Sequence, residues 1–265
     1  MRKLLHIFCS IVSAVLVLLL MPVSSWSHCV VGKRFLPSTI AIDDPCMSDE
    51  LSFVFNYLKS QDEHDYSLSV GYSKRILPHF GIEIGDAYQF LKPSGEKTQP
   101  GFSNLEVGLK YQFLTNSPHE TVFSIALDAE IGHTGNSSVD ADNFTTITPV
   151  FDFGQGFGDL PDSMKYLRPF AITGVIGPSI PTSSENPDSM NYGFTLQYSL
   201  QYLQSYIKDV GLPVPFNRMV VLVEFPFETD LNRGSGGQTT GFVDPGIIWF
   251  GKHIELGAEA QIPIN

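Results

Sequence analysis

Residues 191–204 read NYGFTLQYSLQYLQ, a stretch in which large apolar residues alternate with small or polar ones. A period of two is typical of an extended strand, because successive side chains point to opposite faces of a sheet. One face of this strand is therefore aromatic and aliphatic, and the other is small and polar. The fold of the chain must place these two faces in different environments.

The same alternation recurs along most of the chain, for example in DYSLSVGYSK, NLEVGLKYQF and HIELGAEAQIPI. It predicts eleven strands, at 51–59, 65–74, 79–90, 104–114, 120–132, 144–154, 168–180, 191–204, 217–231, 240–250 and 253–264. No long stretch has a helical period, and only LQSYIKDVGL, residues 203–212, suggests a short helix after a strand. The 23 Gly and 18 Pro also favour many turns and little helix.

The composition of the two faces indicates which solvent each one meets. The apolar face is rich in Phe and Tyr, which raise the aromatic fraction to 12%. The other face is mostly Ser, Gly, Thr and Gln, whereas a water-exposed surface usually has many long charged side chains. A lipid core offers no hydrogen-bond partners, so strands that cross it must close into a ring. We therefore expect an all-β fold, an antiparallel transmembrane β-barrel of about 12 strands, rather than a periplasmic β-sandwich or a soluble barrel.

Eleven strands do not close a bacterial barrel, which has an even strand number and both ends of the chain on the periplasmic side. Three explanations remain open. The count is wrong, the N-terminal segment supplies a strand, or a final strand lies beyond IPIN at the end of this sequence. We favour the third.

The N-terminus predicts export. MRK is followed by a long apolar run and then by SSWS, which offers small residues at a cleavage site. We expect a signal peptide over 1–27, a periplasmic or lumenal N-terminal segment over 28–50, and the outer-membrane barrel over 51–265. A retained transmembrane anchor is the alternative for the apolar run. In an exported chain the remaining pair, Cys29 and Cys46, favours a disulfide over a metal site, with two free thiols as the alternative.

Catalytic chemistry has no clear signature in this chain. The histidines fall at strand ends or in turns, and none has the spacing to a serine that a catalytic pair requires. GSGGQTTG has neither the lysine nor the helix of a phosphate-binding loop. We therefore expect no enzyme, no cofactor and no metal. The formal charge of −12, with basic residues scattered, also argues against a nucleic-acid partner.

The polar faces carry many acidic residues and few basic ones. The candidates for lining a solute pathway are Glu83, Glu106, Lys110, Asp128, Glu130, Gln197, Gln201, Glu224, Glu255 and Glu259. Crowded carboxylates require partners, solvent or protonation. One hypothesis is a cation-preferring pathway. A second is that the N-terminal segment, with Lys33 and Arg34, folds into the lumen and pairs with some of the acids, and a third is a water-filled interior.

Several segments resemble bacterial outer-membrane β-barrel proteins of the family named after the meta pathway of phenol degradation. They include VGKRFLPSTIAIDDPCMSDELSF, SVGYSKRILPHFGIEIGDAY, GFSNLEVGLKYQFLTNSPHE and FGQGFGDLPDSMKYLRPFAITG. The resemblance implies a passive transporter or porin-like barrel for small, hydrophobic or aromatic solutes in a Gram-negative outer membrane. Its partners would be outer-membrane lipids, the solute and the barrel-assembly machinery. The alternative is a non-conducting structural barrel whose lumen is filled by side chains.

Overall fold

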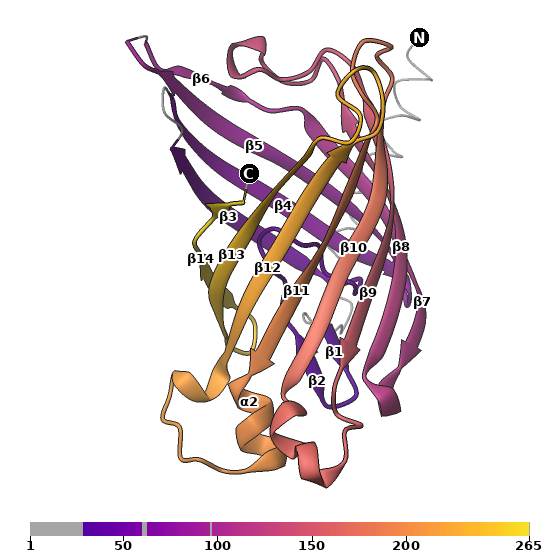
Figure 1. Cartoon of the computed structure of the whole chain (residues 1–265), viewed down its shortest axis with the longest axis vertical. Coiled ribbons are helices and arrows are strands. Elements are labelled where there is room, and N and C mark those ends of the chain that lie inside the picture. Colours follow the sequence, from indigo (N-terminus) through magenta and orange to yellow (C-terminus); the bar gives the residue numbers. More distant parts are fainter. Residues whose placement is uncertain (1–28, 60–62, 96, 265) are drawn as a thin grey trace, which may run out of the picture.

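The computed structural model describes residues 29–59, 63–95 and 97–264, with only the backbone of Glu63, and the predicted signal peptide lies outside these residues. Eleven antiparallel strands follow one another around a strongly curved sheet in the order β14-β13-β12-β11-β10-β9-β8-β7-β5-β4-β3 (Figure 1). Their bounds are β3 Glu50–Lys59, β4 Glu63–Leu77, β5 Phe80–Pro93, β7 Leu105–Asn116, β8 Thr121–Ile131, β9 Thr146–Gly156, β10 Phe170–Pro181, β11 Ser189–Ser199, β12 Met219–Asp230, β13 Thr239–Phe250 and β14 Glu255–Glu259. The predicted all-β antiparallel barrel architecture and its eleven strands are thus confirmed.

The remaining elements are short. Strand β6, Gln99–Phe102, pairs with β5, and β15, Ile262–Pro263, pairs with β13, whereas β1, Cys29–Val31, and β2, Arg34–Leu36, form a separate hairpin. Short helices of three to six residues occupy the connections, at Ser117–His119, Ser137–Val139, Asp162–Leu167, Leu200–Tyr202 (α2), Leu203–Ile207 and Phe216–Arg218. The two longest connections of the α2 end, 157–169 and 200–218, lie together at the bottom of Figure 1.

The two faces of the sheet point as the alternation predicts. On β11 the side chains of Phe194 and Leu196 are 38% and 40% exposed, whereas Thr195 and Gln197 are 0% and 2% exposed. The same contrast on β8 sets Ile125 outside and Ser124 inside. Apolar side chains therefore cover the convex face, and the concave face that encloses the lumen is largely polar apart from an apolar region at the α2 end, which includes Val122, Val220 and Phe250.

The prediction for 191–204 is wrong at its C-terminal end. The strand ends at Ser199, whose hydroxyl accepts a hydrogen bond from the Tyr202 amide at 3.1 Å and caps the first turn of α2. Gln201 consequently lies in α2, beyond the strand on which it was predicted. The short helix expected within 203–212 begins earlier, at Leu200.

The sheet remains open between its first and last strands. In the described part of the chain, β3 and β14 pair only with β4 and β13 respectively. Closure by a further strand stays a prediction from the sequence.

Candidate functional site

Residues 29–49, which we call the plug, pack against the concave face of the sheet (Figure 1). The β1–β2 hairpin turns at Gly32, whose φ of +64° suits glycine, and a disulfide joins Cys29 to Cys46. The predicted N-terminal segment thus lies on the concave side of the sheet, and the structure contains the disulfide that the two cysteines suggested. A cross-linked hairpin gives this short segment a defined shape without a core of its own.

The hairpin half of the plug has an apolar interface with the wall. Its buried Cys29, Val31, Leu36 and Cys46 form one cluster with wall residues Val122 and Ala171. Phe35 forms a second cluster with Val220 and Phe250, and the Phe35 and Phe250 rings lie 4.1 Å apart between centroids. Water is therefore excluded around the hairpin, which fixes it at the α2 end of the lumen.

Arg34 ties the hairpin to the connections of the α2 end. Its guanidinium is 1% exposed and donates to the Glu120 carboxylate at 2.9 and 3.1 Å and to the Pro169 carbonyl at 2.8 Å. The Tyr202 ring lies 4.0 Å from its central carbon, which suits a cation–π contact. Burial lowers the pKa of Arg34, and the charge of Glu120 opposes this shift. Burial, then Glu120, raises the pKa of the Tyr202 phenol to about 12.

The other half of the plug contains residues 38–44, which we call the gate loop. Three consecutive backbone amides of this loop, at Ile40, Ala41 and Ile42, donate to the Glu224 carboxylate at 3.1, 2.9 and 2.9 Å. The hydroxyl of Thr195 donates to the same carboxylate at 3.1 Å. A fully buried carboxylate is stable here because four donors surround it.

A second contact joins the gate loop to the wall at Lys110, which is 1% exposed. Its ammonium donates to the Asp43 carboxylate and, at 2.9 Å, to the Asp44 carbonyl. Glu83 and Asp152 of the wall lie 3.5 and 4.0 Å from the same nitrogen. Lys110 thus shares its charge between the gate loop and two wall acids, and it offsets their mutual repulsion. Burial raises the pKa of the neighbouring Asp44 well above its usual value.

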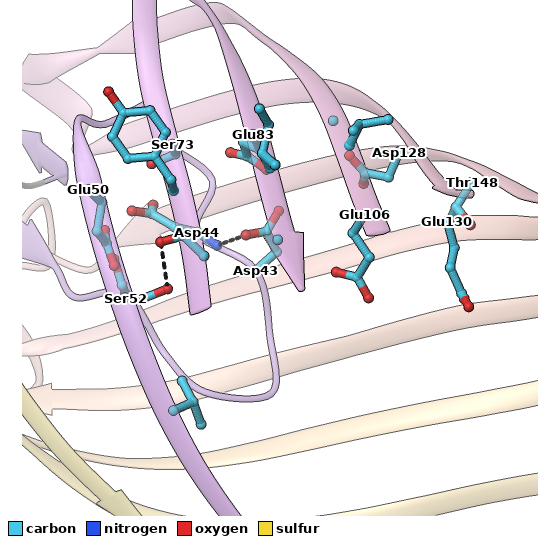
Figure 2. Close-up of a pocket in the computed structure, with 18 of the residues that line it drawn as sticks. Asp43, Asp44, Glu50, Ser52, Ser73, Glu83, Glu106, Asp128, Glu130 and Thr148 are labelled. Carbon is cyan, nitrogen blue, oxygen red and sulfur yellow. Dashed lines mark hydrogen bonds between the residues drawn. The ribbon is translucent and has the colours of Figure 1, made fainter. Parts of the chain in front are cut away.

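A cavity of about 600 Å³ lies between the gate loop and the wall (Figure 2). Of the described residues that line it, none is Lys, Arg or His, and Tyr72 is the one aromatic residue. The lining carboxyl groups come from the plug, from Glu50 at the start of β3, and from the wall: Asp43, Asp44, Glu50, Glu83, Glu106, Asp128 and Glu130. The cavity is acidic but also has an apolar part of its lining, which includes Val54, Ile84 and Val107, and its shape depends on the position of the gate loop.

The structure separates the predicted pathway residues into three groups. Glu83, Glu106, Asp128 and Glu130 line the cavity. Lys110, Gln197 and Glu224 are buried in the wall. Glu255 and Glu259 lie on the terminal strand β14, with intermediate exposure, and Gln201 is the exception described above.

Four residues of this site were not predicted. Asp43 and Asp44 lie in a segment without periodicity, Glu120 follows a turn, and Thr195 looked like one small residue among many on a polar face. The signals for the plug were the pair of cysteines and its charge, because Lys33 and Arg34 stand in a chain whose polar faces are mostly acidic.

No family model matches the chain, and no curated protein matches it. Among the described residues, none of the helices has the length and apolar character that crossing a membrane requires. Within the same residues, one group of three potential metal ligands has its ligand atoms within 4.8 Å of one another: Cys29, Asp44 and Cys46. The two cysteine sulfurs of this group are joined in the disulfide.

Proposed function

We propose that this protein is an outer-membrane β-barrel that passes small polar solutes, with a preference for cations. The observation that carries the proposal is the division of the sheet into an apolar convex face and a concave face rich in polar and acidic side chains. Such a division suits a wall with lipid on one side and an aqueous path on the other.

The convex face supports the membrane location. Large apolar side chains are exposed on strand after strand, among them Leu51, Phe53, Phe55, Leu109, Ile125, Leu127, Leu196, Val221, Ile247 and Leu256. A continuous apolar surface around a sheet is not stable in water, because soluble monomers expose patches of only a few hundred Å². Outer-membrane lipids are the partner that fits it. Export by the signal peptide at 1–27 and insertion by the barrel-assembly machinery follow from this proposal.

The cavity favours polar or cationic solutes. Its carboxyl groups attract positive charge, and its single aromatic residue offers little surface for stacking. The family resemblance implies hydrophobic or aromatic solutes instead, so the two sources differ on the solute class. The proposed preference for cations is based on the residues that line the cavity.

One observation favours the alternative, a non-conducting structural barrel. The plug fills part of the lumen and contacts the wall through β7, β8, β12 and β13. Such a barrel would have a filled interior and would pass no solute.

Flux measurements separate the two functions. The full chain is reconstituted in liposomes, and swelling is followed with neutral sugars, amino acids and organic cations, while reversal potentials in planar bilayers give the ion preference. We expect cations to pass more readily than anions, and Glu106→Gln with Asp128→Asn to reduce that preference. Asp188→Asn, in a connection at the opposite end from α2, is the matched control. Equal passage of anions would reject cation preference, and no flux of any solute would support the structural barrel.

The membrane location has its own test. Leu196→Arg places a charge on the proposed lipid face and should reduce insertion by about 2–4 kcal/mol near the bilayer midplane. Unchanged partitioning into vesicles would contradict a lipid-facing convex surface.

A further inference from the structure

We infer that the gate loop, residues 38–44, opens and closes the lumen while the rest of the plug stays in place, and that Glu224 is its latch. The inference rests on the proposed function, because a gate requires a path. It is carried by the contrast between the two halves of the plug.

The ends of the gate loop are fixed. Before it, the β1–β2 hairpin is held by two apolar clusters and by the buried Arg34–Glu120 pair. After it, Cys46 is covalently joined to Cys29, the Met47 amide donates to Gln112 at 3.1 Å, and Lys74 pairs with Asp49 at 2.9 Å. Pro37 and Pro45 stand at the two borders. Movement is thus confined to the segment between two anchored points.

The gate loop itself is held by polar contacts that water can replace. Its amides bind Glu224, and Asp43 binds Lys110. Ile42 is its one fully buried apolar side chain among the described residues, since Ile40 is 41% exposed. Release of the loop would expose the Glu224 carboxylate and the Thr195 hydroxyl bonded to it, together with the single apolar side chain of Ile42. Exchange of hydrogen bonds between protein and water has a small net cost, so this loop can open more easily than the hairpin.

Glu224 is the principal latch because one carboxylate binds three consecutive amides. Hydrogen bonds to a charged acceptor contribute more than neutral ones. Lys110 is a weaker determinant, since it retains Glu83 and Asp152 when Asp43 leaves. The same loop supplies Ser38, Thr39, Ile40, Asp43 and Asp44 to the cavity, so its departure would also widen the acidic path.

The test follows exposure of a buried loop residue. Ile42→Cys is prepared in a Cys9→Ser background, where the native pair is closed, and its reaction with a polar maleimide is timed in detergent-solubilised full-length protein. Glu224→Gln should accelerate labelling about tenfold or more, as expected when the charge of a hydrogen-bonded carboxylate is removed. Asp43→Asn should accelerate labelling less, and this variant remains informative if Glu224→Gln fails to fold. Ile40 is already exposed, so Ile40→Cys should be labelled at the same rate in the parent protein and in the Glu224→Gln and Asp43→Asn variants.

A matched control distinguishes the latch from a general loss of acidic charge. Glu130→Gln removes a carboxyl group of the same cavity whose partner, Asn104, belongs to the wall, so labelling of Ile42→Cys should not change. In liposomes, solute flux should rise for Glu224→Gln and not for Glu130→Gln. Unchanged labelling in both Glu224→Gln and Asp43→Asn, or faster labelling without greater flux, would overturn the gate. Absence of flux from every protein would instead reject the proposed passage, because the labelling result stands independently of conduction.

Discussion

Replacement of Glu120 by glutamine isolates the electrostatic contribution that anchors the plug hairpin. Glu120 and Arg34 are both buried, and the carboxylate receives two hydrogen bonds from the guanidinium and one from the Gly158 amide at 3.3 Å. Glutamine has nearly the same shape, so packing is preserved while the negative charge is lost. The buried guanidinium then retains its backbone carbonyl acceptors and the Tyr202 ring, without a counter-ion.

The expected loss in free energy of unfolding is about 3–5 kcal/mol, the usual cost of leaving one member of a buried ion pair uncompensated. The two charged hydrogen bonds alone, at about 1.5–3 kcal/mol each, give a total in the same range. Asp162→Asn provides the contrast. Its partner is also an arginine, Arg168, at 2.8 Å, but the Asp162 side chain is 93% exposed. A solvated pair of this kind contributes less than about 1 kcal/mol.

Urea unfolding of the full chain in detergent micelles, followed by tryptophan fluorescence and extrapolated linearly to zero urea, measures both variants. A double variant, Arg34→Met with Glu120→Gln, completes the cycle and should recover part of the loss, because no buried charge is then left unpaired. If Glu120→Gln lost no more than Asp162→Asn, the pair would not anchor the hairpin, and the fixed end assigned to the gate loop would be removed.

Three further outcomes follow from the same contacts. Replacing Cys29 and Cys46 by serine should lower the unfolding free energy by about 3 kcal/mol, since the bridge spans 17 residues, and a reducing agent should have the same effect on the native protein alone. Gly193→Ala should cost about 1–3 kcal/mol in urea unfolding, because the new methyl would overlap the gate loop and lie 2.8 Å from a backbone oxygen of β12, whereas Gly85→Ala, whose methyl would have its nearest neighbour at 3.5 Å, should be tolerated. The folded-state pKa of Tyr202, about 12, exceeds the usual value of 10, so folding favours the neutral phenol. The contribution of Tyr202 to the free energy of unfolding should be complete below pH 10 and lost as the pH rises to about 12. Tyr202→Phe should flatten this decline in unfolding free energy, and equal declines in both proteins would contradict this assignment.

The sheet was predictable because its determinants are local and repeated. The exposed Phe194 and Leu196 and the buried Thr195 and Gln197 follow from a period of two, and ten further strands repeat that pattern. The prediction failed where a local hydrogen bond favoured a helix over the strand. At Ser199 the side chain caps α2 and ends the strand before Gln201. The positions of Glu83, Glu106, Asp128 and Glu130 around one cavity follow from the same register.

The plug could not be placed in this way, because its position depends on contacts across large separations in the sequence. Arg34 meets Glu120, 86 residues away, and Ile42 meets Glu224, 182 residues away. The gate loop also lacks the periodicity by which the strands are recognised, for a physical reason. In a strand of the sheet its amides would be bonded to a neighbouring strand, whereas an irregular backbone leaves three successive amides free to converge on one carboxylate. An irregular backbone therefore has two consequences. It gives the gate loop no sequence period by which to predict it, and it allows Glu224 to bind the loop and to release it without breaking a sheet.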